Sequence, residues 1–237
     1  MNTARVAHSP EESVPQLFSY TVRFDDGAAP NPFNGLCTLA ICKPGIRAAA
    51  KSGDWIAGIG SSNAAHGRDL SHRLVYAMRV KESIPLAEYH RRAQSEWPDR
   101  IPKINSKSLP DRLGDCIYYE DHEGKLLQRK GSVHNQGNYA RDVSGKNVLI
   151  SDHFYYFGRE AILLPEHLYG IRHPFQGHKR QANDHLVQPF IDWISSLNFE
   201  VGQLYGWPDH MVDWSQKSGS CGGCAVRQLD DEHDPSC

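Results

Sequence analysis

The groups best suited to chemistry in this sequence lie in a short run that begins at position 151. Residues 151–157 read Ser-Asp-His-Phe-Tyr-Tyr-Phe, so a hydroxyl, a carboxyl and an imidazole stand beside four aromatic rings. A pocket for an extruded nucleobase needs both kinds of group, because flat rings stack on the base while polar groups read its edge. The run predicts two sets of site residues: base-binding Ser151, Tyr156 and Phe157, and acid–base candidates Asp152 and His153. The alternative is that its rings belong to the core of a strand, where aromatic residues are common.

Further candidate groups lie upstream, in segments rich in turn-forming residues. Asn31 and Asn34 flank a proline, and an asparagine amide can form two hydrogen bonds with the edge of adenine. Asp54 follows a glycine at the start of an apolar strand and is a further acid–base candidate. Tyr76, in the next strand, joins the predicted base-binding residues. The alternative for Asn31, Asn34 and Asp54 is turn chemistry, in which their side chains bond to backbone amides.

Basic side chains gather near position 178. His178, Lys179 and Arg180 are consecutive, and Arg172 lies shortly before them. Because lysine and arginine are common partners of phosphate, we predict that Lys179, Arg180 and Arg172 bind phosphate. His178 belongs to the same cluster and is also an acid–base candidate. The alternative is a solvated charged surface without a ligand.

The six cysteines fall into two groups. Cys37, Cys42 and Cys116 lie in apolar stretches, where we expect buried thiols or metal ligands rather than disulfides. Near the C-terminus, four residues have the ligand types of a tetrahedral zinc site: Cys221, Cys224, His233 and Cys237. Their spacing is unusual and few apolar residues lie between them, so we favour a tail without an ordered metal. No other cofactor is required by the sequence.

The composition excludes several classes of protein. The chain has 237 residues and a net charge of −2, so a protein held to DNA by a large basic surface is not expected. No apolar run approaches the roughly 18 residues that a membrane-spanning helix needs. The first residues lack the apolar core of a secretory signal, so we expect a cytoplasmic protein without a membrane partner. The sequence also lacks the signatures of P-loops, dinucleotide-binding loops, zinc nucleobase deaminases and serine hydrolases.

The elements that position the candidate groups are mostly short strands. Apolar alternation predicts strands over residues 37–41, 55–59 and 74–80, which we expect to share one curved sheet. Further strands are predicted over 115–119, 148–151 and 154–157, and along the last one Phe154 and Tyr156 should face one side and Tyr155 and Phe157 the other. Strands outnumber helices and do not alternate regularly with them. We therefore predict an α+β fold: a mostly antiparallel, PUA-like β-barrel with a few packed helices.

Two helices and one domain complete the predicted organisation. Ser83 is expected to cap one helix, and residues 184–197 carry the apolar spacing of a second. Pro189 fits only in the first turns of that second helix. We expect one domain over 18–214, a flexible arm over 1–17 and a flexible Cys-rich tail over 215–237.

Three stretches of the chain resemble the nucleotide modification associated domain 2 family. They are residues 29–44, with Asn-Pro-Phe-Asn-Gly; residues 52–78, with Ser-Gly-Asp-Trp; and residues 151–179, with Ser-Asp-His-Phe-Tyr-Tyr-Phe-Gly. The resemblance implies a link to modified nucleobases, so the partners are a nucleic acid or nucleotide carrying such a base and proteins of DNA modification or defence systems. The strand pair 55–59 and 74–80 is also similar to PUA-like and EVE-like barrels, some of which hold a modified base.

Three functions are compatible with these observations. The first is recognition or modification of a non-standard nucleobase in DNA. The second is an enzyme that acts on a free modified nucleotide. The third is a protein-interaction module whose aromatic residues all lie in the core, without a ligand pocket. The resemblance implies no particular reaction, so whether the protein is an enzyme stays open at the level of sequence.

Overall fold

A computed structural model of the protein describes residues 14–130, 133–175 and 177–210. Its largest element is a six-stranded mixed sheet with the order β1-β3-β4-β9-β11 and with β10 paired to β4. The strands are β1 (Leu17–Val22), β3 (Trp55–Gly60), β4 (Arg73–Arg79), β9 (His153–Tyr156), β10 (Ile162–Leu163) and β11 (Gln203–Leu204). β1 is parallel to β3 and β11 is parallel to β9, whereas the remaining neighbours are antiparallel.

Two smaller sheets lie beside the large one. The first is antiparallel with the order β2-β8-β5, and the second is the hairpin of β6 and β7. Their strands are β2 (Cys37–Leu39), β5 (Glu82–Pro85), β6 (Tyr118–Glu120), β7 (Leu126–Gln128) and β8 (Asn147–Ser151). β8 leads directly into β9, so a single bend near Asp152 passes the chain from the β2-β8-β5 sheet to the large sheet.

The α+β class is confirmed, but the predicted barrel is wrong. The described residues form no closed barrel, and the large sheet is mixed rather than antiparallel throughout. β3 and β4 are neighbours as expected, whereas β2 pairs with β8 in the other sheet. The physical reason is the parallel pairing of β1 with β3. Parallel neighbours need a crossover, and here the crossover carries β2 out of the large sheet.

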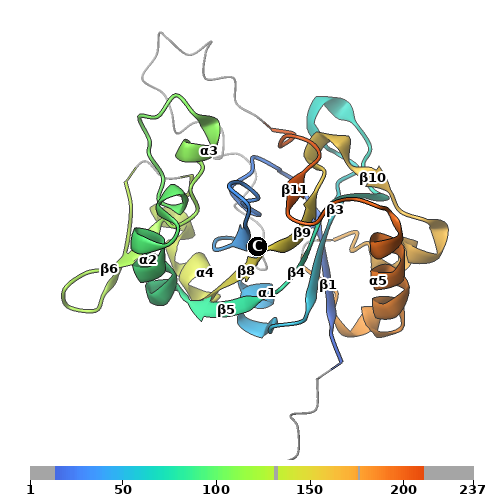
Figure 1. Ribbon diagram of the computed structural model, residues 1–237, viewed down its shortest axis with the longest axis horizontal. Helices are drawn as coiled ribbons and strands as arrows, with labels where there is room; N and C mark the ends of the chain where they lie inside the picture. Colours follow the sequence, from blue (N-terminus) through green and yellow to red (C-terminus); the bar gives the residue numbers. More distant parts are fainter. Residues whose placement is uncertain (1–13, 131–132, 176, 211–237) are drawn as a thin grey trace, which may run out of the picture.

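Helices flank the sheets on two sides (Figure 1). The α-helices are α1 (Pro44–Ala49), α2 (Leu86–Ser95), α3 (Leu109–Arg112), α4 (Tyr139–Ser144) and α5 (Val187–Ser196). Short 3-10 turns cover Ala65–Gly67, Pro98–Arg100, Gln136–Asn138, Gly158–Glu160, Glu166–Ile171 and Gln181–Leu186. The chain passes through α2, α3 and α4 on one side of the large sheet in Figure 1, and through α5 on the other.

Both predicted helices exist, with different starts. The first begins at Leu86 rather than near Ser83, because Ser83 pairs with Leu149 in the ladder between β5 and β8. The second begins as a 3-10 turn and becomes α-helical at Val187, which places Pro189 in the first turn as expected. Phe190 and Ile194 of this helix are buried against the large sheet.

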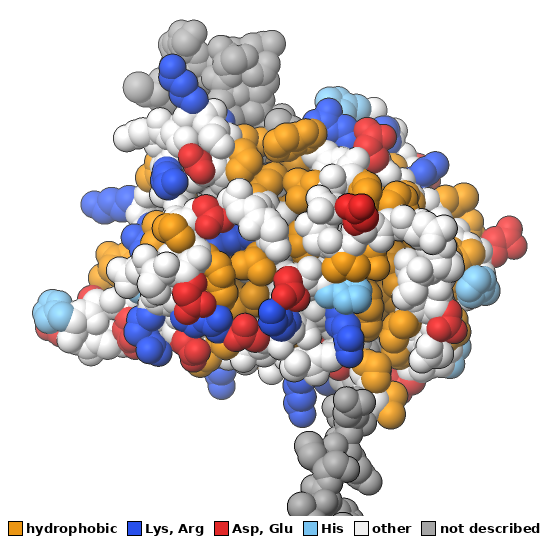
Figure 2. Space-filling model, viewed as in Figure 1, with side chains coloured by type: hydrophobic (Ala, Val, Ile, Leu, Met, Phe, Trp, Pro, Cys, Tyr) orange, Lys and Arg blue, Asp and Glu red, His pale blue; other side chains and the backbone are white. Residues whose placement is uncertain are grey.

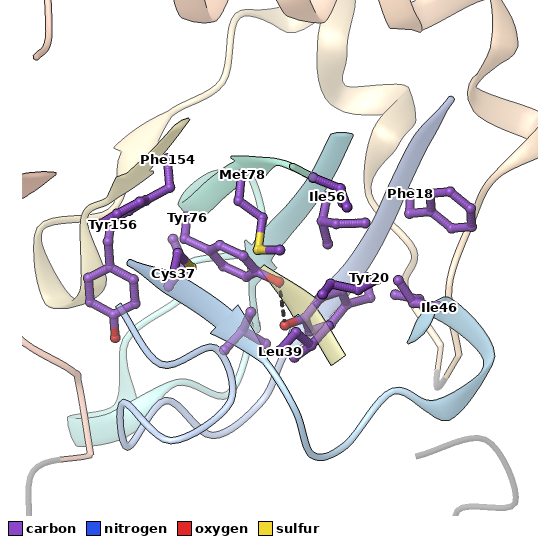
Figure 3. Close-up of a cluster of buried hydrophobic side chains, with 14 of the residues drawn as sticks. Phe18, Tyr20, Cys37, Leu39, Ile46, Ile56, Tyr76, Met78, Phe154 and Tyr156 are labelled. Carbon is purple, nitrogen blue, oxygen red and sulfur yellow. Dashed lines mark hydrogen bonds between the residues drawn. The ribbon is translucent and has the colours of Figure 1, made fainter. Parts of the chain in front are cut away.

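Three clusters of buried side chains hold these layers together. The first lies between the large sheet and the β2-β8-β5 sheet and contains Phe154 and Tyr156 (Figure 3). The second lies under α5, on the other face of the large sheet, and contains Tyr155 and Phe157. The third joins α2 to β5, β6 and β8. The predicted alternation of side chains along 154–157 is therefore confirmed, and both faces of this strand are buried.

The charged surface and the lengths of the helices fit a chain with a net charge of −2 and without long apolar runs. Figure 2 shows acidic and basic side chains interspersed over one face rather than gathered into a field of one sign. Within the described part of the chain, no helix combines the length and the apolar character needed to cross a bilayer.

Candidate functional site

Three side chains that are far apart in the sequence meet beside α1 and α4. The Sγ atom of Cys42 lies 3.4 Å from Nε2 of His134. Nδ1 of the same imidazole lies 2.5 Å from Oδ2 of Asp142. A thiol, an imidazole and a carboxylate in this order have the arrangement of a catalytic triad, in which the base activates the nucleophile and the carboxylate orients the base. We refer to Cys42, His134 and Asp142 as the thiol triad.

The contacts of His134 fix the role of each ring nitrogen. An ionised carboxylate only accepts hydrogen bonds, so Nδ1 must carry a proton toward Asp142. That tautomer leaves Nε2, which faces Cys42, as the atom that can take the thiol proton. In this geometry Cys42 can act as a nucleophile and His134 as its general base.

The pKa of His134 agrees with this assignment. Burial alone lowers the pKa of an imidazole, but the negative charges of Cys42 and Asp142, together with their hydrogen bonds, raise the pKa of His134 to about 10. His134 can therefore keep, at neutral pH, a proton that it takes from Cys42.

Asp142 is held ionised by three donors. Its Oδ1 accepts the backbone N–H of Cys42 at 2.9 Å, and its Oδ2 accepts Nδ1 of His134 and the hydroxyl of Tyr118 at 2.8 Å. Burial would raise the pKa of this fully buried carboxyl, but the bonds from His134 and Tyr118 lower it below its usual value. Asp142 can thus orient His134 and stabilise its positive charge without taking a proton.

The backbone presents Cys42 in a strained conformation. Cys42 lies between β2 and α1 with a φ of 59°, and Lys43 follows with a φ of 42°. Left-handed backbone at a residue other than glycine costs about 1–3 kcal/mol and persists only where surrounding contacts enforce it. Here the N–H of Cys42 is fixed by Asp142, and its carbonyl accepts Nε of Arg47 at 2.7 Å.

Arg47 forms hydrogen bonds to three segments around the site. Its buried guanidinium donates to the carbonyls of Cys42, Asp142 and Asn147, so one side chain links the turn after β2, helix α4 and the start of β8. Gly145 leaves room for it, because a Cβ there would lie 2.6 Å from the guanidinium carbon. Arg47 can therefore position Cys42 relative to Asp142. Its hydrogen bonds go to backbone carbonyls and not to the thiol or the imidazole.

The candidates predicted in turns form hydrogen bonds within the protein. Asp54 accepts the backbone N–H groups of Gln16 and Lys51, each at 2.8 Å, which is the turn chemistry foreseen as the alternative. Asn31 is buried; its amide nitrogen donates to the Leu113 carbonyl and its oxygen accepts from Arg100. Asn34 is exposed and donates to Asp99 at 2.6 Å.

The run 151–157 is divided between the surface and the core. Asp152 is exposed and pairs with Lys81 at 2.5 Å, and the half-buried ring of His153 lies 5.2 Å from that of Trp55. The Ser151 hydroxyl donates to the Arg79 carbonyl at 2.6 Å. These contacts place the run at the bend between the two larger sheets.

The predicted base-stacking rings are all buried. The hydroxyls of Tyr76 and Tyr20 lie 2.9 Å apart and point toward one another in Figure 3, whereas the Tyr156 ring points away from this pair. Tyr156 donates to Asp25, whose pKa is raised to about 7 because burial outweighs this bond. Phe157 packs on the opposite face of the sheet. Stacking on a base stays a prediction for Tyr76, Tyr156 and Phe157.

The predicted phosphate-binding residues separate into two places. The His178 ring lies 6.0 Å from that of Phe18, and the Arg180 guanidinium lies 5.8 Å from the same ring. Lys179 instead donates to the Gly170 carbonyl. The pKa of Asp69 is lowered mainly by hydrogen bonds from Ser71 and to a smaller extent by the charge of Arg172. The structure therefore brings His178 and Arg180 together at Phe18, whereas the Lys179 ammonium is directed to the Gly170 carbonyl.

The four candidate zinc ligands of the tail lie in a part of the chain that the structure does not describe. Cys221, Cys224, His233 and Cys237 all lie beyond position 210. Within residues 14–130, 133–175 and 177–210, no group of three or more His, Cys, Asp or Glu side chains is placed to hold a metal ion.

Sequence reasoning missed the thiol triad. Cys42 was expected only as a buried thiol or a metal ligand, although it stands at the end of an apolar strand just before Lys-Pro-Gly. His134 and Asp142 follow 92 and 100 residues later, and no spacing rule connects such distant positions. The usable signal was the position of Cys42 at the junction of a strand and a helix.

Comparisons with known proteins identify the family of the chain. Neither a comparison with curated proteins nor one with solved structures found a match. The model of the nucleotide modification associated domain 2 family, by contrast, matches residues 14–217, a span that includes the thiol triad and every predicted site residue outside the tail. Because this match covers most of the 237 residues, the chain belongs to the nucleotide modification associated domain 2 family.

Proposed function

We propose that the protein is a cysteine-dependent enzyme that acts on an acyl group carried by a modified nucleotide. The observation that carries the proposal is the thiol triad, in which His134 contacts the Cys42 thiol through one nitrogen and the Asp142 carboxylate through the other. The family name supports a nucleotide as the substrate. Neither the interaction-module function nor passive base recognition explains why a thiol, an imidazole and a carboxylate meet in this order.

The proposed reaction begins at Cys42. His134 takes the thiol proton on Nε2, and the Sγ thiolate attacks the carbonyl carbon of an amide or ester on the substrate. The tetrahedral intermediate collapses to a thioester on Cys42, and the leaving amine or alcohol takes the proton from His134. Water or an amine then attacks the thioester with His134 again as base. This second step releases the acyl product and restores the Cys42 thiol.

The proposed substrate is a non-standard nucleobase of DNA that carries the acyl or amide group. The family name supports the link to nucleotides, and a free modified nucleotide is the alternative substrate. A thiolate suits this chemistry because sulfur is a strong nucleophile at neutral pH and a thioester is readily attacked by water or an amine.

The test combines substrate conversion with capture of the intermediate. The full-length protein is incubated with modified and unmodified DNA, nucleosides and nucleotides, and both the nucleotides and the protein are analysed by mass spectrometry. We expect one modified substrate to change and an acyl group to appear on the peptide containing Cys42. Cys42→Ala should abolish both signals, whereas the matched control Cys116→Ala should retain them. Conversion that persists in Cys42→Ala would contradict the proposal.

A further inference from the structure

We propose that Lys43, His178 and Arg180 form a phosphate-binding site beside Cys42, through which the enzyme holds the phosphate of its nucleotide substrate. The inference deepens the proposed function and rests on it for the identity of the substrate. We refer to these three residues as the cationic cluster.

The cluster is built on two aromatic residues of β1. Phe18 and Tyr20 are two positions apart on one strand, so their rings lie on the same face, and both belong to the cluster of buried residues between the two larger sheets. The Arg180 guanidinium lies 5.8 Å from the Phe18 ring and the Lys43 ammonium lies 4.7 Å from the Tyr20 ring. Two cations from segments far apart in the sequence thus lie along one face of β1.

His178 brings the cluster to the start of α1. A Cβ at Gly45 would lie 3.0 Å from Cε1 of His178, so the imidazole packs directly against the first turn of that helix. Lys43 immediately follows Cys42 in the same turn. The same few residues after β2 therefore include Cys42, provide Lys43 and contact His178.

The cluster is electrostatically suited to an anion. Burial lowers the pKa of His178, and the positive charges of Lys43, Arg180 and His173 lower it further. Every charged group that shifts this imidazole is thus a cation. A bound phosphate would relieve the mutual repulsion and accept charge-assisted hydrogen bonds from lysine and arginine.

The other two predicted phosphate-binding residues do not join the cluster. Lys179 donates to the Gly170 carbonyl at 2.8 Å, and Arg172 is not among the charges that lower the pKa of His178. The predicted phosphate-binding run therefore contributes His178 and Arg180 to the site, and Lys43 replaces Lys179 and Arg172. The ligand chemistry is a phosphate group, carried either by a free nucleotide or by the backbone of DNA.

Two alkylating reagents, one neutral and one negatively charged, test the site. Iodoacetamide is neutral and iodoacetate is an anion. Both alkylate the Cys42 thiolate: a bond forms between Sγ and the CH2 carbon of the reagent, and the carbon–iodine bond breaks to release iodide. The measured quantity is the ratio of the iodoacetate rate to the iodoacetamide rate at Cys42, determined by peptide mass spectrometry on the full chain. Because each variant provides its own iodoacetamide rate, a change in thiol reactivity cancels from the ratio.

We expect Arg180→Gln and Lys43→Gln each to lower this ratio about threefold to tenfold at low salt, as expected for removal of one nearby charge. The control is Lys125→Gln, which removes an exposed charge in the β6–β7 turn and should leave the ratio unchanged. Equal ratios in wild type, Arg180→Gln and Lys43→Gln would overturn the cationic cluster. If instead Cys42 reacts no faster than Cys116 with either reagent, the proposed function fails and not the cluster alone.

Protection experiments distinguish the sources of phosphate. Thymidine, thymidine 5′-monophosphate and a short single-stranded oligothymidylate are each added before iodoacetamide. We expect a phosphate-bearing probe to slow alkylation of Cys42 in wild type and to do so less in Arg180→Gln. Protection by the monophosphate indicates a free nucleotide, and protection by the oligonucleotide alone indicates DNA. Equal protection by thymidine and by both phosphate-bearing probes would contradict the site.

Discussion

Cys42 and Cys116 each lie beside a histidine, but a different third group touches each imidazole. At Cys42 that group is the carboxylate of Asp142, which faces Nδ1 of His134 and leaves Nε2 toward the thiol. At Cys116 it is the guanidinium of Arg129, whose Nη2 lies 3.2 Å from the same His90 nitrogen that lies 3.9 Å from the thiol.

This difference gives the two histidines pKa shifts of opposite direction, raised for His134 and lowered for His90. Arginine only donates hydrogen bonds, so Nδ1 of His90 must accept from Arg129 and cannot also take a proton from Cys116. Burial and then Arg129 lower the pKa of His90, and burial, followed by Asp115, raises the pKa of the Cys116 thiol to about 12. The sign of the third charge and the access of the thiol to solvent thus distinguish a nucleophile from an inert buried cysteine.

Removal of the nucleophile should have the largest effect. Cys42→Ala should lower the rate of substrate conversion by about 10⁴-fold or more, as expected when a covalent nucleophile is lost. Cys116→Ala should change the rate by less than about threefold, because that thiol is not used. Steady-state kinetics on the substrate identified by mass spectrometry provides the comparison. Similar losses in both variants would remove the distinction between the two cysteines.

Removal of the carboxylate should have the next largest effect. Asp142→Asn keeps the shape of the side chain but removes the charge that fixes the His134 tautomer, so we expect a loss on the order of 10³- to 10⁴-fold in kcat. Tyr118→Phe removes one hydrogen bond to Asp142 and retains the charge, so it should cost far less. Urea denaturation of both variants separates loss of activity from loss of fold. A fully active Asp142→Asn protein would exclude the triad mechanism.

The dependence of stability on pH should also differ between the two histidines. The pKa of His134 is raised in the folded protein, so its contribution to stability is fully present below about pH 6.5 and is lost as the pH rises through about 10. Between pH 7 and 10, wild type should therefore lose more free energy of unfolding than His134→Gln, by a few kcal/mol at most. Parallel pH profiles for the two proteins would show that His134 gains no proton on folding.

The pH dependence of stability that is due to His90 should have the opposite sign to that of His134. Its pKa is lowered by burial and Arg129, so the neutral ring is favoured in the folded state and protonation at low pH disfavours folding. We expect His90→Gln to reduce the loss of stability between pH 7 and 5, by about 1 kcal/mol or less. Denaturation midpoints at a series of pH values measure both effects in one experiment.

The smallest expected effect tests which factor keeps Cys116 inert. Arg129→Gln removes the positive charge beside His90, but burial is the first cause of the high thiol pKa. Alkylation of Cys116 should therefore remain slow and change by less than about threefold. A large acceleration would show that the charge of Arg129, rather than burial, keeps the reactivity of the Cys116 thiol low.

Local pattern was sufficient for several elements of the fold. The alternation of side chains in 154–157 and the apolar face of α5 are confirmed, because strand and helix periods are properties of neighbouring residues. The turn chemistry of Asp54 was also foreseen as an alternative, since Gly-Asp at the start of a strand bonds to nearby amides. The assignment of β2 to one sheet with β3 and β4 failed, because strand partners are chosen over long separations.

The sequence by itself determined the α+β class, the positions of most strands and helices, the alternation of side chains along 154–157 and the family resemblance. Only the tertiary structure decided that β2 pairs with β8 and that Cys42 meets residues 92 and 100 positions away. The physical reason is that the triad depends on contacts among α1, α4 and the loop before α4, held by the buried Arg47 guanidinium. Such contacts follow from packing of the whole chain and leave no periodicity in the sequence.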